Sequence, residues 1–74
     1  MEDQLRTAFA DALGTTPDQI TDATTYSEFP NWDSVAHMAL IAAIEESFDI
    51  MIDAEDVIDM SSFAKAKQIV AKYL

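Results

Sequence analysis

Residues 31–35 read Asn-Trp-Asp-Ser-Val and place a serine and an aspartate where a helix is predicted to begin. Ser34 opens a segment of helical apolar spacing that runs to Phe48, and serine is a favoured N-cap because its hydroxyl accepts a hydrogen bond from a free backbone N–H. Asp33 adds a carboxylate beside the positive end of that helix. Free N–H groups at a helix N-terminus also bind phosphate, so the Ser34 hydroxyl lies where a phosphate group would be stabilised.

The composition is that of one small and strongly acidic domain. The 74 residues include 14 acidic and 4 basic side chains, a formal net charge of −10, and half of them are apolar. This length is near the lower limit for one packed core, so we expect a single domain over residues 1–74. The acidity argues against nucleic-acid binding, which needs cations to neutralise phosphates, and it favours partners with basic surfaces.

Cysteine and long apolar segments are both absent from the chain. Without cysteine there is no disulfide, no thiolate nucleophile and no Cys-based metal site. No apolar run is long enough to cross a membrane, and residues 1–3 lack the basic flank and the apolar run of a signal peptide. We therefore expect no membrane insertion and a cytoplasmic location.

Apolar residues recur at helical spacing in four segments, and no strand pattern competes with them. The predicted helices cover about residues 2–13, 34–48 and 53–59, and a fourth follows a cap at Ser61 or Ser62. Gly14, the only glycine, suits the left-handed position that ends the first helix. The predicted fold is an all-α four-helix bundle with a long first loop and a short third helix.

The first loop, residues 15–33, is long for a compact domain and should contain local structure. Thr16-Pro17-Asp18-Gln19 is typical of a capping box with proline at the first helical position, which predicts one short turn. We expect Ile20, Tyr26 and Phe29 to pack this loop onto the core.

The helix over residues 34–48 carries two apolar stripes. Leu40, Ile41, Ile44 and Phe48 form one stripe and should face the core. Val35, Met38 and Ala42 form a second line, which starts beside Ser34. A small bundle has little room to bury both, so the second line is either a docking strip for partners, the interpretation that we favour, or simply the edge of the core.

Two segments at a characteristic spacing resemble the acyl carrier protein family. Asp33-Ser34-Val35 matches the family's Asp-Ser-Leu signature, with valine as a tolerated replacement. Residues 43–49, Ala-Ile-Glu-Glu-Ser-Phe-Asp, match the usual end of the family's second helix. The order of helices, the length and the acidity agree as well, so the likeness covers nearly the whole chain.

The resemblance implies a carrier role for the chain and no enzymatic activity of its own. Ser34 would bear a 4′-phosphopantetheine arm, added from coenzyme A by a separate phosphopantetheinyl transferase, and the thiol of the arm would hold acyl or aminoacyl groups as thioesters. Asp33 would help to present the site to the transferase. Further expected partners are the enzymes that load and transfer the acyl or aminoacyl groups, and we expect the carrier to be a monomer.

The chain departs from the family pattern on both sides of the serine. Pro30-Asn31-Trp32 stands where the family usually has a glycine, and the early helix has Ala36, His37 and Ala39 where fatty-acid carriers have acids. These differences imply a stand-alone carrier of a specialised pathway rather than the fatty-acid synthase carrier. Partners should then bind the apolar line, while Glu45 and Glu46 add electrostatic steering.

Four other interpretations concern a cleft, a hydrolase, a metal site and an adaptor. Tyr26, Leu40 and Ile44 could line a cleft for an aliphatic chain, or belong to the ordinary core. A hydrolase using Ser34 and His37 is disfavoured, because Asp33 precedes the serine instead of orienting the imidazole. The acids of residues 53–59 lack the glycine and the terminal glutamate of a calcium loop, so we expect no metal site. The main rival function is an acidic helical adaptor whose serine stays unmodified.

Overall fold

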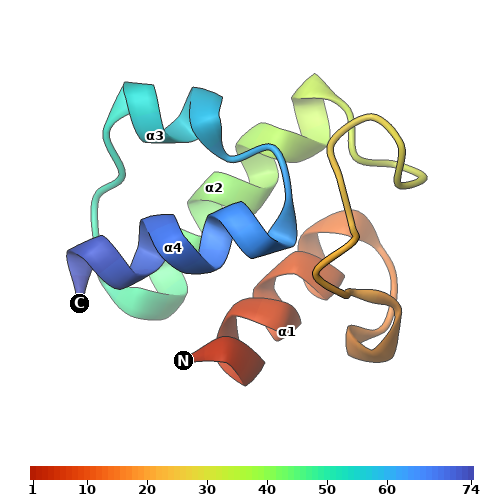
Figure 1. The fold of residues 1–74 in the computed structure, drawn as a ribbon, viewed down its shortest axis with the longest axis horizontal. Coiled ribbons are helices and arrows are strands. Elements are labelled where there is room, and N and C mark those ends of the chain that lie inside the picture. Colours follow the sequence, from red (N-terminus) through yellow and green to blue (C-terminus); the bar gives the residue numbers. More distant parts are fainter.

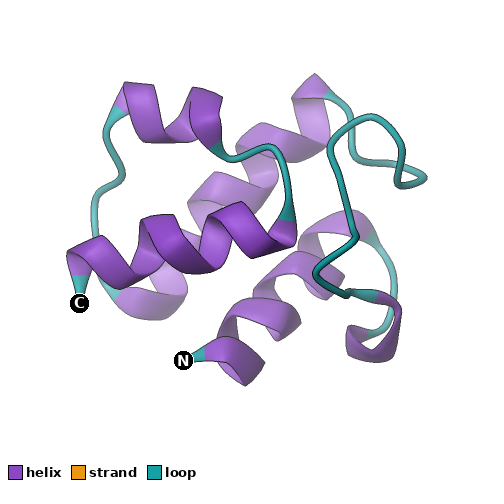
Figure 2. Ribbon diagram, viewed as in Figure 1, coloured by secondary structure: helices purple, strands orange, loops and turns teal.

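Four α-helices, one short 3₁₀ helix and no β-strand make up the fold (Figures 1 and 2). The computed structural model describes residues 1–74, and the all-α prediction is confirmed. None of the helices has the length and apolarity that crossing a bilayer requires. The elements are α1 (Glu2–Leu13), η1 (Pro17–Gln19), α2 (Ser34–Phe48), α3 (Ala54–Asp59) and α4 (Phe63–Tyr73).

Local capping interactions explain where the helices end. Gly14 takes the left-handed conformation, with φ 69°, and its N–H bonds to the Ala10 carbonyl, as its position in the sequence predicted. Asp49 closes α2 in the same way, with φ 55°. Ser62 is the cap of α4, and its hydroxyl accepts the Lys65 N–H at 3.0 Å.

The predicted capping box at the start of η1 does not form. The Thr16 hydroxyl donates to the Asp18 carboxylate at 2.5 Å, and no side-chain cap bond to the backbone is present. The segment is a single 3₁₀ turn, Pro17–Gln19, and the Gln19 N–H that a capping box would use donates instead to the Thr16 carbonyl at 3.0 Å.

The core lies where α1, α2 and α4 meet, and it is closed by the long loop. The Phe9 ring is edge-on to Trp32 at 5.4 Å and to Phe63 at 5.1 Å, which joins α1 to the loop and to α4. The sequence did not identify Trp32 as a core residue, yet it is only 1% exposed. The buried apolar residues are Leu5, Ala8, Phe9, Ala10, Leu13, Ile20, Trp32, Leu40, Ile41, Ile44, Ile52, Met60, Phe63, Ala66, Ile69 and Val70.

Some residues expected in the core lie at its edge. Ile20 is buried as predicted, but Phe29 is half-buried and Tyr26 is 37% exposed. Phe48, expected on the core face of α2, is also only half-buried. It lies in the last turn of α2, next to the cap at Asp49.

Backbone hydrogen bonds hold the long loop against the connection between α3 and α4. The Tyr26 N–H donates to the Ser61 carbonyl at 2.9 Å, and the Phe63 N–H donates to the Thr24 carbonyl at 3.0 Å. Thr25 and Ser62 form an isolated antiparallel bridge between these two bonds. The loop therefore has a defined position directly before the Ser34 segment.

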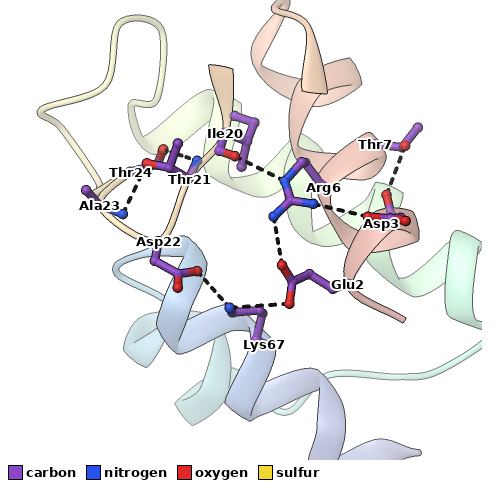
Figure 3. Close-up of polar contacts among 10 residues, drawn as sticks. All are labelled: Glu2, Asp3, Arg6, Thr7, Ile20, Thr21, Asp22, Ala23, Thr24 and Lys67. Carbon is purple, nitrogen blue, oxygen red and sulfur yellow. Dashed lines mark hydrogen bonds and ion pairs between the residues drawn. The ribbon is translucent and has the colours of Figure 1, made fainter. Parts of the chain in front are cut away.

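A network of charged side chains joins α1, the loop and α4 (Figure 3). Arg6 pairs with Glu2 at 2.8 Å and donates to the Ile20 carbonyl at 3.1 Å. Lys67 lies 2.7 Å from Asp22 and 3.5 Å from Glu2. The Arg6 hydrogen bond holds the pKa of Glu2 below its ordinary value. Arg6 and Lys67, two of the four basic side chains, are therefore paired within the fold, and most of the other acids have no cationic partner.

Candidate functional site

Asp33, and not Ser34, caps the N-terminus of α2. Its carboxylate accepts the Ala36 N–H at 2.9 Å, and its carbonyl accepts the His37 N–H at 2.8 Å. The prediction that Ser34 is the cap is therefore wrong by one residue: Ser34 is the first residue of the helix. Because the aspartate supplies the capping acceptor, the exposed Ser34 hydroxyl is not needed to cap the helix.

A tight turn brings Ser34 to the surface. The Ser27 N–H donates to the Trp32 carbonyl at 3.1 Å, and the Trp32 N–H donates to the Phe29 carbonyl at 3.2 Å. Ser27 and Asn31 have positive φ values of 63° and 73°. Asparagine tolerates this conformation better than most residues, so Asn31 serves where a glycine would otherwise be expected. Two residues before the serine, the Trp32 side chain anchors the turn in the core.

His37 joins the buried tryptophan to α3. The Trp32 Nε1–H donates to His37 Nδ1 at 3.0 Å, and His37 Nε2 lies 2.8 Å from the Val57 carbonyl. An indole nitrogen only donates, so Nδ1 must accept, and the proton must be on Nε2, which donates to Val57. The imidazole is therefore neutral in this arrangement. Nothing in the sequence pairs these three residues, because they lie on three different elements.

The same contacts argue against a hydrolytic site. A general base must accept the proton of the Ser34 hydroxyl, but both nitrogens of His37 are already occupied by Trp32 and Val57.

No group of three or more His, Asp or Glu side chains lies close enough together to hold a metal ion. Asp56, one of the acids considered for calcium, instead binds Lys72 at 2.7 Å and Tyr73 at 2.5 Å.

An apolar pocket of about 270 Å³ lies between α2 and α3, beside Ser34. Tyr26, one of the three residues considered for a cleft, lines this pocket. Leu40 and Ile44 do not: both are fully buried, and neither lines any pocket on the surface. The pocket is lined by Tyr26, Ser34, His37, Met38, Val57, Ile58, Met60 and Ser61, with no acidic, lysine or arginine side chain among them.

The apolar line of α2 faces outward. Val35 is 79% exposed, Met38 is 60% exposed, and Ala42 is exposed as well. Ile58 of α3, which is 81% exposed, lines the same pocket as Met38. Sequence reasoning missed Ile58, because it lies in a six-residue helix rich in acids with too few turns to show a periodic face.

The two glutamates near the end of α2 have different surroundings. Glu46 is exposed, whereas Glu45 is half-buried and its carboxylate accepts the Ile52 N–H at 2.9 Å. Glu45 therefore holds the connection between α2 and α3 in place. Of the two acids that the sequence assigned to partners, only Glu46 is free of such a structural role.

The start of α2 is suited to an anion bound to Ser34. The first N–H groups of a helix have no partner within it, and Asp33 occupies only that of Ala36, so those of Ser34 and Val35 stay available. They and the positive end of the helix favour a phosphate ester on the adjacent hydroxyl. Residues 3–70 match a protein family described as "Phosphopantetheine attachment site".

Proposed function

Because this chain belongs to the phosphopantetheine-attachment family of acyl carrier proteins, whose cofactor is a covalent 4′-phosphopantetheine, we propose that Ser34 is the attachment residue. When attached, the arm supplies the thiol that the chain lacks, and that thiol holds acyl or aminoacyl groups as thioesters. The protein would present these groups to partner enzymes and catalyse no reaction itself. The observation that carries the proposal is an exposed serine hydroxyl at the first residue of α2, beside two backbone N–H groups without partners.

The residues around Ser34 fit a modification carried out by another protein. In the transfer, Ser34 Oγ forms a bond to the phosphorus that carries the pantetheine, and the bond from that phosphorus to adenosine 3′,5′-bisphosphate breaks. The serine proton needs an acceptor, and His37 is unavailable because both of its nitrogens are hydrogen-bonded. In this proposal a separate transferase supplies the base, and Asp33, adjacent to the hydroxyl, would help to present the site to it.

We assign the docking of partners to the apolar surface beside Ser34. It comprises Val35, Met38 and Ala42 of α2 together with Ile58 of α3, which are all exposed. Val35 follows Ser34 directly, and Met38 and Ile58 line the same pocket as Ser34. Exposed apolar side chains next to an acidic surface suit partners with an apolar centre and a basic rim. Glu46 would steer such partners, which include the transferase and the enzymes that load and transfer acyl or aminoacyl groups.

The test of the attachment is a mass measurement. The purified protein is incubated with coenzyme A, magnesium and a phosphopantetheinyl transferase of broad specificity, and we expect its mass to rise by one phosphopantetheinyl group. Ser34→Ala should abolish the increase. Ser61→Ala is the matched control, because Ser61 lines the same pocket but lies outside the helix N-terminus, and it should be modified like the wild type.

The opposite result would favour the rival function. If several transferases leave the wild-type mass unchanged while the protein is folded, the attachment proposal fails and the acidic adaptor becomes the better account. Modification that persists in Ser34→Ala would move the site to another hydroxyl.

A further inference from the structure

The pocket beside Ser34 ends against a wall that is closed by hydrogen bonds. Two of its lining residues extend below the surface, because Met60 is only 1% exposed and His37 is half-buried. Leu40 and Ile44 have no exposed surface, and none of the five pockets reaches them. The volume beside Ser34 is therefore separated from the apolar interior of the bundle.

The contacts of His37 make this wall costly to open. Its ring lies nearly parallel to that of Trp32, with ring centroids 6.0 Å apart, and the Tyr26 ring packs against the imidazole at 81°, with centroids 5.5 Å apart. Moving His37 aside would break its bonds to the Trp32 indole and to the Val57 carbonyl. The Trp32 N–H would then be left without a partner in a residue that is 1% exposed, which is unfavourable for a buried donor.

The chemistry of the pocket also discriminates between kinds of cargo. No carboxylate lines it, so the ammonium group of an aminoacyl thioester would lose water there without gaining a counter-ion. An uncharged acyl chain would instead contact Met38, Val57 and Ile58. The arm starts at Ser34 on the rim of the pocket, so its thioester end reaches the pocket only by folding back.

We propose that His37 is a specificity-determining residue, which closes the pocket toward the core and limits the sheltered cargo to a short, uncharged acyl group. This inference rests on the proposed attachment at Ser34. A longer chain remains in solvent beyond the pocket, because the hydrogen-bonded wall keeps it from Leu40 and Ile44.

The first experiment uses the wild-type protein loaded with acyl groups of increasing length. The transferase attaches the pantetheine arm from butyryl, octanoyl and dodecanoyl coenzyme A, mass spectrometry verifies each product, and methyl NMR signals are compared with those of the unacylated holo-protein. We expect the butyryl group to shift the Ile58 methyl signals, and we expect Leu40 and Ile44 to stay unchanged with every chain. An alanyl group should leave Ile58 unshifted.

Variants of His37 test the role of the wall. His37→Ala removes both hydrogen bonds and should allow the dodecanoyl chain to shift Leu40 and Ile44. In His37→Gln the amide can accept from Trp32 and donate to Val57, so its spectra should follow the wild type. Ser61→Ala changes the lining of the pocket without removing a hydrogen bond of the wall, so the Leu40 and Ile44 signals should stay unshifted with the dodecanoyl chain.

Several results would overturn the inference. A dodecanoyl chain that shifts Leu40 or Ile44 in the wild type would show that the wall does not exclude it, and this result stands even if His37→Ala does not fold. A folded His37→Ala variant with unshifted core signals would remove the role of His37, and an alanyl group that shifts Ile58 like butyryl would refute the preference for uncharged cargo. Failure of the attachment itself is recognised separately, by an unchanged mass, and would overturn both proposals.

Discussion

Substitutions of Asp33 separate the stability of α2 from the presentation of Ser34. Asp33→Ala removes the acceptor of the Ala36 N–H, a 2.9 Å hydrogen bond, and also a charge at the positive end of the helix. Loss of such a cap costs about 1 kcal/mol, and loss of the charge costs about 0.3–1 kcal/mol. The sum is about 1–2 kcal/mol, which should lower Tm by about 4–16 °C, because each kcal/mol shifts Tm by about 4–8 °C in a domain of this size. Asp33→Asn keeps an acceptor, so it should lose only the smaller, electrostatic part.

The assay measures unfolding free energy and modification rate on the same variants. Denaturant unfolding gives the stability, and the initial rate of phosphopantetheinylation gives the presentation. If the carboxylate acts on the transferase, Asp33→Asn should be modified more slowly although it is nearly as stable as the wild type. Ser62→Ala is the matched control, because it removes the equivalent cap of α4, where Ser62 accepts the Lys65 N–H at 3.0 Å. It should lose about 1 kcal/mol and be modified at the normal rate.

Two outcomes would refute this reasoning. If Asp33→Asn is destabilised as much as Asp33→Ala, the hydrogen bond to the Ala36 N–H is not the source of the stability. If Asp33→Asn is modified at the wild-type rate, the carboxylate has no part in presentation, and its role is confined to the helix.

Three further predictions concern the partner surface and the acids. Met38→Glu should change the free energy of unfolding by less than about 0.5 kcal/mol, because the side chain is exposed. It should nevertheless lower kcat/KM with a cognate partner about tenfold, or about 1.4 kcal/mol. Loss of the folded state would show that Met38 is a core residue. Glu46→Lys should slow association and flatten its salt dependence in stopped-flow measurements. Glu45→Ala should instead cost about 1 kcal/mol of stability, because the Glu45 carboxylate accepts a backbone N–H. If Glu46→Lys and Glu45→Ala change the association rate equally, Glu46 is not the residue that steers partners. The Lys72 ammonium and a tyrosine hydroxyl hold the pKa of Asp56 below its ordinary value, so the pair stabilises the fold at neutral pH and this contribution is lost as the pH falls below about 4. Asp56→Asn should therefore be less stable than the wild type at pH 7, and its stability should depend less on pH below about 4. If the variant and the wild type lose stability identically on acidification, the Asp56 pair does not stabilise the fold.

Features that depend on residues close together along the chain could be predicted from the sequence. The bounds of α1 and the left-handed Gly14 follow from interactions within one or two turns, and the cap of α4, predicted at Ser61 or Ser62, is Ser62. The exposed line from Val35 was also predictable, since the spacing of apolar residues on α2 exceeds what one face can bury. The prediction of the cap of α2 failed by one residue, because Asp33 and Ser34 are both good caps and the sequence does not rank them.

The sequence by itself thus determined the helices, the acidic surface and the position of the serine at a helix start. Only the tertiary structure decided what surrounds that serine. Trp32, His37 and Val57 come from a loop and two helices, and Glu45 reaches past the end of its own helix to the Ile52 N–H. Such contacts depend on how the loop and α3 pack against α2, and no periodicity or local propensity encodes that packing. The wall between the pocket and the core is therefore a property of the folded chain, because its hydrogen bonds form only between elements that the fold brings together.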